Sequence, residues 1–329
     1  MKNYRLAIVG ASGLVGRTMV KVLEERNFPV GNLKLLASEK SAGQKISFRS
    51  KEYSVEELTK DSFSGVEIAL FSAGGACSKE YAPVAAKAGC VVIDNSSAWR
   101  LDGSISLVVP EVNPEDLRWH KNIIANPNCS TIQMLAAIKP IVDKYGLERL
   151  VCSTYQSISG AGQKGVDKLT GEIADPTYND GKHKIAYNTM FHSAKIDGFT
   201  DEEYKMIHET RKMLHMPELR LAMTCVRLPL LGGHGESLNL ELKNEYQLED
   251  IRTLINETEG LVLVDDIENE EYPTPLAAQN RDEVFIGRLR RDDSCRNGLY
   301  MWVVADNLRK GAATNAVQIA EKMIEMGLV

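Results

Sequence analysis

Cys129 stands in the stretch NPNCST, between Asn-Pro-Asn and Ser-Thr. It follows a short apolar run, residues 122–125, and precedes a stretch with helical spacing, residues 131–138. We therefore expect this thiol to lie where a strand ends and a helix begins. The dipole and the free N–H groups of a helix start stabilise a thiolate, and the same groups can hold an oxyanion. The pattern predicts a nucleophilic cysteine; a buried cysteine without a reaction is the alternative.

A nucleophilic thiol needs a base nearby, and His234 is the best candidate among the histidines. It lies on a glycine-flanked loop in RLPLLGGHGES, after a strand-like run that carries Arg227. An arginine there can bind a carboxylate through two parallel hydrogen bonds. The other histidines lie in charged, helix-like or loop contexts, and most of them are expected at the surface: His120, His183, His192, His208 and His215.

Glycine recurs every third residue after the apolar run Tyr4–Val9, at Gly10, Gly13 and Gly16. These glycines open a stretch with the periodicity of an amphipathic helix, Leu14–Glu25. Backbone N–H groups at such a helix start can hold a pyrophosphate. Ser12 replaces the second glycine of the usual fingerprint, so a plain tight turn is the alternative. The pattern predicts a dinucleotide site.

The next strand-like run ends in a polar turn, ASEKSAG, that bears on the choice of cofactor. A site for NAD usually places an acidic side chain here for the ribose 2′-hydroxyl, and Glu39 is available. Ser38, Lys40 and Ser41 are better suited to a 2′-phosphate, so we predict NADP, with a solvated turn as the alternative. A thiolate beside a nicotinamide indicates a reaction in which an aldehyde becomes a thioester as hydride leaves to the cofactor.

The elements that position these residues fall into two patterns. In the first half, apolar runs alternate with helical patterns, which indicates a parallel, doubly wound sheet that collects ligands at its carboxyl edge. After Cys129 strands dominate, which predicts a mixed α+β domain, and the final stretch, 311–326, is a helix that could pack on the first domain. The expected strands are 4–9, 33–37, 67–72, 90–94, 150–156, 221–227, 238–243, 261–265, 284–289 and 299–305, with helices at 163–170 and 200–214.

The composition limits the classes of partner. A chain of 329 residues is expected to form two domains. Its net charge of -6 argues against nucleic acid or an anionic membrane as the main partner. No signal-peptide core or membrane span is predicted. The six cysteines form no C-x-x-C pair, so we expect free thiols in a reducing cytoplasm and no metal site.

In sequence, the chain resembles aspartate-β-semialdehyde dehydrogenase of the bacterial type from end to end. The stretches that carry the resemblance are GASGLVG, ASEKSAG, VIDNSSAWR, VVPEVN, NPNCST, YQSISGAG, CVRLPLLGGHGES, YPTPLAAQNRDEVFIGRLRRD and ADNLRKGAATNAVQIAE. The resemblance implies reversible, NADPH-dependent conversion of L-4-aspartyl phosphate to L-aspartate 4-semialdehyde and inorganic phosphate, through a cysteine thioester. That step leads toward diaminopimelate, lysine, threonine and methionine.

The resemblance also implies an organisation. A Rossmann-type NADP-binding domain would comprise residues 1–128 with 308–329, and a mixed α+β catalytic and dimerisation domain residues 129–307. The strand-rich second domain would form the interface of a cytoplasmic homodimer, or of a pair of dimers.

The resemblance assigns roles residue by residue. Cys129 would be the nucleophile, His234 the general acid/base, and Gln156 would orient the substrate. The implied substrate ligands are Arg227 for the carboxylate, Glu202 for the ammonium group, and Arg100 and Lys205 for phosphate, with Asn95 nearby. The three-residue spacing places Glu202 and Lys205 on one helix face. From the residues alone, Arg100, Glu202 and Lys205 would be ordinary surface charges.

For the cofactor the resemblance points to Gly10, Ser12, Gly13, Leu14, Val15, Gly16, Ser38, Lys40, Ser41, Ser159, Gly160, Gly162 and Asn307. The chain departs from the family pattern at one place. Arginine is frequent where Lys40 stands, after a small residue where this chain has Glu39. A lysine keeps the charge but lacks the planar fork, which weakens the preference for NADP.

Three alternatives remain open from the sequence. An N-acetyl-glutamyl-phosphate reductase shares the architecture, but its substrate has no ammonium group for Glu202. A non-catalytic relative that serves as a binding protein would be expected to lose Cys129 or its base. An acylating aldehyde dehydrogenase that uses coenzyme A gives no reason for two basic residues at a phosphate site.

Overall fold

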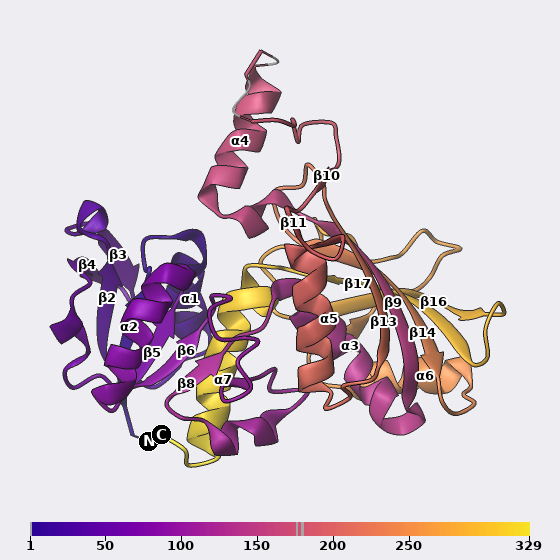
Figure 1. Cartoon of the computed structure of the whole chain (residues 1–329), viewed down its shortest axis with the longest axis horizontal. Helices are drawn as coiled ribbons and strands as arrows, with labels where there is room; N and C mark the ends of the chain where they lie inside the picture. Colours follow the sequence, from indigo (N-terminus) through magenta and orange to yellow (C-terminus); the bar gives the residue numbers. More distant parts are fainter. Residues whose placement is uncertain (1, 176, 179–180) are drawn as a thin grey trace. The chain divides into compact units, whose positions relative to one another are not determined.

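The computed structural model describes residues 2–175, 177–178 and 181–329. The chain forms two compact units, each with its own sheet (Figure 1). The first unit joins Met1–Asn128 to the C-terminal segment Ala312–Val329, and the second is Cys129–Gly311.

The first unit has an eight-stranded sheet in the order β3-β4-β2-β1-β5-β6-β8-β7. All neighbouring strands run parallel except β3 and β4. The predicted parallel, doubly wound sheet is therefore confirmed. The strands are β1 Tyr4–Val9, β2 Val30–Ala37, β3 Lys45–Phe48, β4 Lys51–Glu57, β5 Ile68–Phe71, β6 Val91–Asp94, β7 Ser106–Leu107 and β8 Ile123–Ala125.

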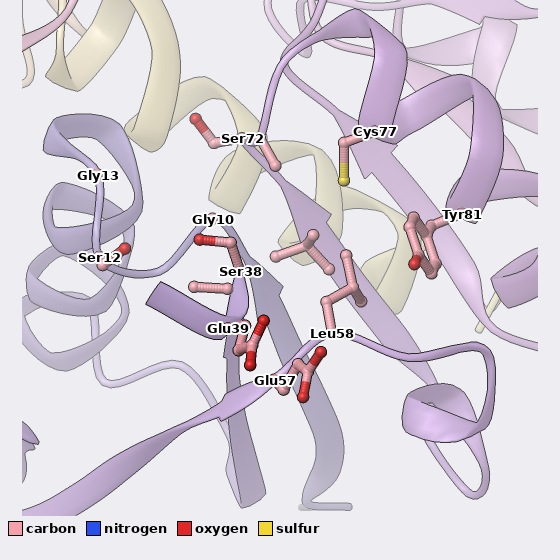
Figure 2. Close-up of a pocket in the computed structure, with 13 residues that line it drawn as sticks. Gly10, Ser12, Gly13, Ser38, Glu39, Glu57, Leu58, Ser72, Cys77 and Tyr81 are labelled. Carbon is pink, nitrogen blue, oxygen red and sulfur yellow. The ribbon is translucent and has the colours of Figure 1, made fainter. Parts of the chain in front are cut away.

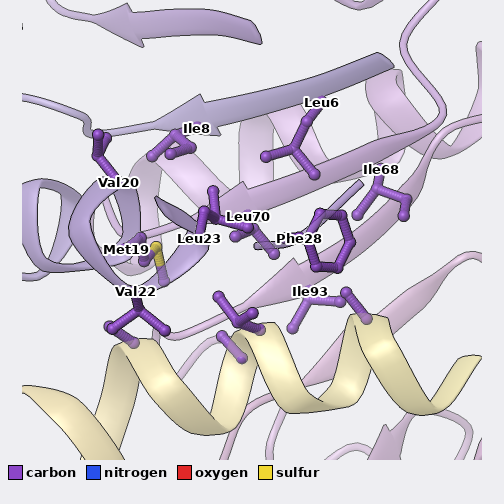
Figure 3. Close-up of a cluster of buried hydrophobic side chains, with 14 of the residues drawn as sticks. Leu6, Ile8, Met19, Val20, Val22, Leu23, Phe28, Ile68, Leu70 and Ile93 are labelled. Atoms are coloured by element: carbon purple, nitrogen blue, oxygen red, sulfur yellow. The ribbon is translucent and has the colours of Figure 1, made fainter. Parts of the chain in front are cut away.

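Helices α1 (Leu14–Glu25), α2 (Gly75–Lys87) and α7 (Thr314–Glu325) belong to this unit. Apolar side chains of β1, β5, β6 and α1 form one buried cluster with those of α7, whose ribbon is yellow in Figure 3. Ala316, Val317 and Ala320 are fully buried in that cluster. The C-terminal helix therefore packs within the first unit, as predicted, because its small residues allow close approach to the sheet.

The second unit has a seven-stranded mixed sheet in the order β10-β13-β9-β14-β17-β16-β15. Its first helix, α3 (Cys129–Tyr145), packs with α5 (Asp201–Met213) and α6 (Leu248–Glu257) and lies against β14, β16 and β17. The predicted mixed α+β arrangement is confirmed. The strands are β9 Leu147–Gln156, β10 Met190–Phe191, β13 Arg220–Arg227, β14 His234–Leu242, β15 Leu261–Leu263, β16 Val284–Asp292 and β17 Gly298–Ala305; β11 Ala194–Ile196 and β12 Phe199–Thr200 form a separate pair, and α4 is Gln163–Ala174.

One boundary in this unit differs from the prediction in a way that matters for chemistry. His234 was expected on a loop, with a strand from residue 238, but β14 begins at His234 itself. The polar segment His234–Ser237 carries no apolar alternation. It is a strand because it pairs with β9 on one side and β17 on the other, and tertiary pairing overrides local preference.

Within the described residues, no helix combines the length and the apolar character needed to cross a membrane. The same residues contain no cluster of three or more histidine, cysteine, aspartate or glutamate side chains that could hold a metal ion.

Candidate active site

Three predicted site residues lie side by side on neighbouring strands. β13 ends at Arg227 and the parallel strand β9 ends at Gln156, and these two residues are register partners. The antiparallel strand β14 begins at His234, which is the register partner of Gln156 on the other side. Residues far apart in sequence therefore meet as a row at the ends of three adjacent strands.

Cys129 is the first residue of α3, as predicted. It is partly exposed, whereas Ser130 and Thr131, which follow it, are fully buried. The first turn of α3 contains no acidic residue, so the positive end of its dipole stays available to a thiolate or an oxyanion. A side chain at Gly311 would come within 2.8 Å of the Cys129 Cβ, so glycine there keeps space beside the thiol.

The Asn-Pro-Asn segment before the thiol is held by hydrogen bonds within the first unit. The Asn126 side chain donates to Asn95 Oδ1 (2.7 Å) and to the Ala312 carbonyl (3.1 Å), and its Oδ1 accepts from Asn315 Nδ2 (2.6 Å). Asn126 is fully buried. An asparagine that donates and accepts at once fixes the chain that leads into α3.

The Gln156 amide is oriented by two donated hydrogen bonds. Its Nε2 donates to Ser130 Oγ (3.0 Å) and to Glu202 Oε1 (2.9 Å). Its Oε1 is buried and has no hydrogen-bond partner among the described residues. A buried amide oxygen without a partner is costly, which points to a ligand that donates to it.

His234 is fully buried and is held through its Nδ1, which accepts from the Ser157 backbone N–H (3.0 Å). Burial, helped by the Arg227 guanidinium, lowers the pKa of His234 to about 3. The ring is therefore neutral near pH 7, and because Nδ1 accepts, its proton resides on Nε2. Nε2 has no partner within the described part of the chain, so this donor is available to a substrate oxygen.

Arg227 is anchored beside His234. Its Nη1 donates to the Ser157 carbonyl (2.7 Å) and its Nη2 donates to His192 Nε2 (2.6 Å). A Cβ at Gly160 would come within 2.8 Å of Arg227 Nη1 and 3.4 Å of His234 Nε2. Glycine at position 160 therefore leaves both groups accessible to a ligand.

His192 was grouped with the histidines expected mostly at the surface, and for this residue the expectation is wrong. Its side chain is half-buried against Arg227, and burial lowers its pKa. It accepts the arginine N–H, so it must be neutral at that nitrogen. No spacing in the sequence links these two residues, which meet through the pairing of β10 with β13.

Helix α5 presents Glu202 and Lys205 on one face, as predicted from their spacing. Lys205 Nζ lies 3.6 Å from Glu202 Oε2 and 2.5 Å from Asp201 Oδ2. The start of the helix is capped reciprocally: Thr200 accepts from the Glu203 N–H (3.3 Å), and the Glu203 carboxylate accepts from the Thr200 N–H (2.8 Å). Glu202 is only 7% exposed, so it is not an ordinary surface charge.

Arg100 and Asn95 lie in the first unit, and Arg100 is likewise buried (7% exposed). Its Nη2 donates to the Asn95 carbonyl (2.8 Å). Asn95 therefore contacts both Arg100 and Asn126, through its backbone and its side chain respectively. This arrangement supports Asn95 as a residue that positions Arg100.

The glycine loop borders a cavity of about 510 Å³ in the first unit (Figure 2). Glycine is required at two places, because a Cβ at Gly10 would come within 2.3 Å of the Ser72 carbonyl oxygen and one at Gly16 within 2.2 Å of the Gly10 carbonyl oxygen. Leu14 and Val15 begin α1, whose first turn contains no acidic residue and whose start has no side-chain cap. A helix start of this kind can hold a pyrophosphate.

The polar turn after β2 forms another wall of this cavity. Ser12, Ser38 and Glu39 are among the lining residues, and Glu57 faces the same space (Figure 2). Ser12 Oγ donates to Ser41 Oγ (3.1 Å), which ties the turn to the glycine loop. Lys40 is exposed and is not among the residues that line the cavity, so its ammonium group would have to swing inward to meet a phosphate.

The remaining predicted cofactor residues lie in the second unit, close to His234. Asn307 is buried; its Oδ1 accepts from the Gly233 N–H (3.0 Å) and from Ser157 Oγ (3.1 Å), and its Nδ2 donates to Ser159 Oγ (3.1 Å). This amide joins the turn before His234 to the segment that contains Gly160 and Gly162. Its visible role is to hold these loops in place.

The chain is similar to known proteins in both sequence and fold. Residues 5–120 match the family described as semialdehyde dehydrogenase, NAD binding domain, and residues 138–310 match semialdehyde dehydrogenase, dimerisation domain. An aspartate-semialdehyde dehydrogenase of Aquifex aeolicus is 53% identical over 99% of this chain and 100% of its own length, and one of Bacillus subtilis is 48% identical over 100% and 99%. A crystal structure of aspartate semialdehyde dehydrogenase II complexed with ASA from Vibrio cholerae superposes with a TM-score of 0.95 at 46% identity, covering 99% of each chain.

Proposed function

The chain belongs to the aspartate-semialdehyde dehydrogenase family, and from this premise we propose that it reduces L-4-aspartyl phosphate to L-aspartate 4-semialdehyde. The reaction is reversible, uses NADPH, and releases inorganic phosphate. One observation supports the proposal most directly: Arg227, Gln156 and His234 form a row, and Gln156 Oε1 and His234 Nε2 are buried without a hydrogen-bond partner among the described residues.

The amino-acid end of the substrate is held by opposite charges. The Arg227 guanidinium binds the α-carboxylate through two parallel hydrogen bonds, beside the glycine that leaves it open. The Glu202 carboxylate, already fixed by the Gln156 amide (2.9 Å), binds the ammonium group. A substrate without a free ammonium group would make no ionic contact with this buried carboxylate, which argues against N-acetyl-glutamyl phosphate.

The acyl phosphate is held by Arg100 and Lys205 while Cys129 attacks. The Cys129 thiolate forms a bond to the carbonyl carbon, and the bond from that carbon to the phosphate oxygen breaks. The N–H groups at the start of α3 stabilise the oxyanion of the tetrahedral adduct, and the Gln156 amide orients the acyl group. The product of this half-reaction is a thioester on Cys129.

Reduction of the thioester is assisted by His234. NADPH, when bound, supplies the hydride to the thioester carbonyl. The His234 Nε2–H donates a hydrogen bond to the oxyanion of the resulting thiohemiacetal, as its buried, neutral state allows. Collapse of this oxyanion re-forms the carbonyl and breaks the carbon–sulfur bond, and the aldehyde and the Cys129 thiolate are released.

The first unit is proposed as the NADP-binding domain. The close approaches at Gly10 and Gly16 and the uncapped start of α1 fit a pyrophosphate. Ser38, Ser41 and Lys40 supply hydrogen-bond donors and a positive charge for a 2′-phosphate. Glu39 faces the same cavity, and its charge reduces the preference for NADP over NAD without abolishing it.

We further propose a cytoplasmic homodimer, formed through the second unit, that serves lysine, threonine and methionine biosynthesis. The match of residues 138–310 to a dimerisation domain supports the assembly. A pair of such dimers is the alternative assembly.

The test is the initial rate of NADP reduction with L-aspartate 4-semialdehyde, in the presence and absence of inorganic phosphate. A rate that requires phosphate supports both the acyl-phosphate chemistry and the substrate. A folded protein that reacts with N-acetyl-glutamate semialdehyde instead, or with neither aldehyde, would contradict the proposal.

A further inference from the structure

Glu236 is a fully buried carboxylic acid for which the proposed mechanism has no use. It lies on β14 two residues after His234, so its side chain is on the same face of the sheet. That face is covered by α3, and the Glu236 carboxyl group faces Ser130 and Gln133 in the first two turns of the helix. The acid therefore lies directly behind the row of site residues.

Among the residues that the structure describes, no positive charge lies close enough to Glu236 to compensate an ionised carboxylate. A charge on Glu236 would raise the pKa of two nearby buried thiols, Cys152 on β9 and Cys225 on β13. On β17 its register partner is Val303, and on β9 it is Thr154. Burial raises the pKa of Glu236 well above its ordinary value, because an unpaired charge in such a site is very costly.

Hydrogen-bond accounting around Glu236 favours a protonated carboxyl group. Both Glu236 oxygens and Gln133 Oε1 are buried without a partner among the described residues. An ionised carboxylate only accepts, so it could not satisfy the Gln133 oxygen. A neutral acid has one O–H donor and one carbonyl acceptor, and can donate to Gln133 Oε1 while it accepts from the Ser130 hydroxyl.

Both neighbours of Glu236 contact site residues. Ser130 Oγ accepts from Gln156 Nε2 (3.0 Å), and Gln133 Nε2 donates to the His234 carbonyl (3.2 Å). We propose that Glu236 acts as a neutral carboxylic acid and a positioning residue, which through Ser130 and Gln133 fixes the Gln156 amide and the start of β14. The role rests on the proposed function, since it concerns the orientation of groups that serve that reaction.

The consequence for the reaction is specific. With Ser130 and Glu202 both accepting from Gln156 Nε2, the amide cannot rotate by half a turn, and its oxygen stays directed away from them. Terminal amide torsions are soft, so loss of the constraint would let the amide turn and would misplace the acyl group. Cofactor binding in the first unit should not be affected.

The test compares Glu236→Gln with Glu236→Ala in the full-length protein. A carboxamide keeps one donor and one acceptor, so Glu236→Gln should retain kcat within about threefold, whereas Glu236→Ala should lose about 10- to 100-fold in kcat with an unchanged KM for NADP. Glu241→Ala is the matched control, because Glu241 is a partly exposed glutamate on the same strand as Glu236 and forms an ion pair with Arg220 of β13.

Infrared spectroscopy provides a second measurement that does not depend on activity or on the alanine variant. The difference spectrum of wild type minus Glu236→Gln at neutral pH should contain the carbonyl stretch of a protonated carboxylic acid. Carboxylate bands alone, a Glu236→Gln variant as impaired as Glu236→Ala, or a fully active Glu236→Ala would each overturn the proposal. An inactive wild type would instead count against the proposed function, and the infrared result would still decide whether Glu236 is neutral.

Discussion

Cys129 is the first residue of α3, whereas Cys77, in the first turn of α2, has its pKa raised by burial. Burial raises the pKa of Cys152 and Cys225, which disfavours their thiolates. Cys129 is partly exposed at the start of α3. Replacing Cys129 by Ala should therefore reduce turnover to below about 10⁻⁴ of the wild-type rate while NADP affinity, measured by titration, stays unchanged. The control is Cys295→Ala, and substantial activity in Cys129→Ala would eliminate the thioester mechanism.

His234 should make folding stability depend on pH in a predictable direction. The folded protein holds the pKa of His234 near 3, below the value of 6.5 that applies to the unfolded chain. The unfolded state therefore binds an additional proton as pH falls below 6.5, so the His234 contribution to stability is complete above pH 6.5 and is lost progressively toward pH 3. Urea unfolding of wild type and His234→Asn should show a steeper loss across this window in wild type. Parallel curves would show that His234 does not titrate as a buried neutral ring.

The start of α5 shows how an element positions charges. Its cap joins Thr200 to Glu203, and the Glu203 carboxylate also accepts from the Cys225 N–H on β13 (3.0 Å). Thr200→Ala should lower stability by about 1 kcal/mol and raise the KM for aspartate semialdehyde, because the first turn carries Glu202 and Lys205. Thr200→Ser, which keeps the hydroxyl, should restore both values. A changed melting temperature with an unchanged KM would mean that the cap serves only the helix.

Helices and strands that are marked by periodicity within a short stretch of sequence could be predicted. The site could be predicted only in part, because some of its contacts join distant segments. The glycine loop, β1 and α1 follow from apolar periodicity within a short window. His192, Ser130 and Glu236 carry no such signal, because each meets the site through strand register or helix packing between distant segments. His234 was predicted on a loop but begins a strand, because pairing with β9 and β17 creates that strand. The resemblance supplied the roles of Arg100, Glu202 and Lys205, which periodicity could not.

The proposed dimer makes a prediction for the whole molecule, based on the outer face of the second sheet. Tyr155 alternates with the fully buried Thr154 and Gln156, so it points to the face opposite α3 and is 37% exposed. It packs edge to face with Trp302 (ring centroids 5.5 Å apart), and Trp302 lies over Gly235. Aromatic side chains on a smooth sheet face are typical of the buried centre of an interface.

Tyr155→Asp should therefore shift the protein from dimer to monomer, because the substitution places a charge where apolar surface would be desolvated. Sedimentation velocity over a range of protein concentrations measures the change. Leu101→Asp is the matched control, since Leu101 is an exposed apolar residue of the first unit, and it should leave the dimer intact. If Tyr155→Asp sediments as wild type does, the outer sheet face is not the interface, and the assembly must use another surface of the second unit.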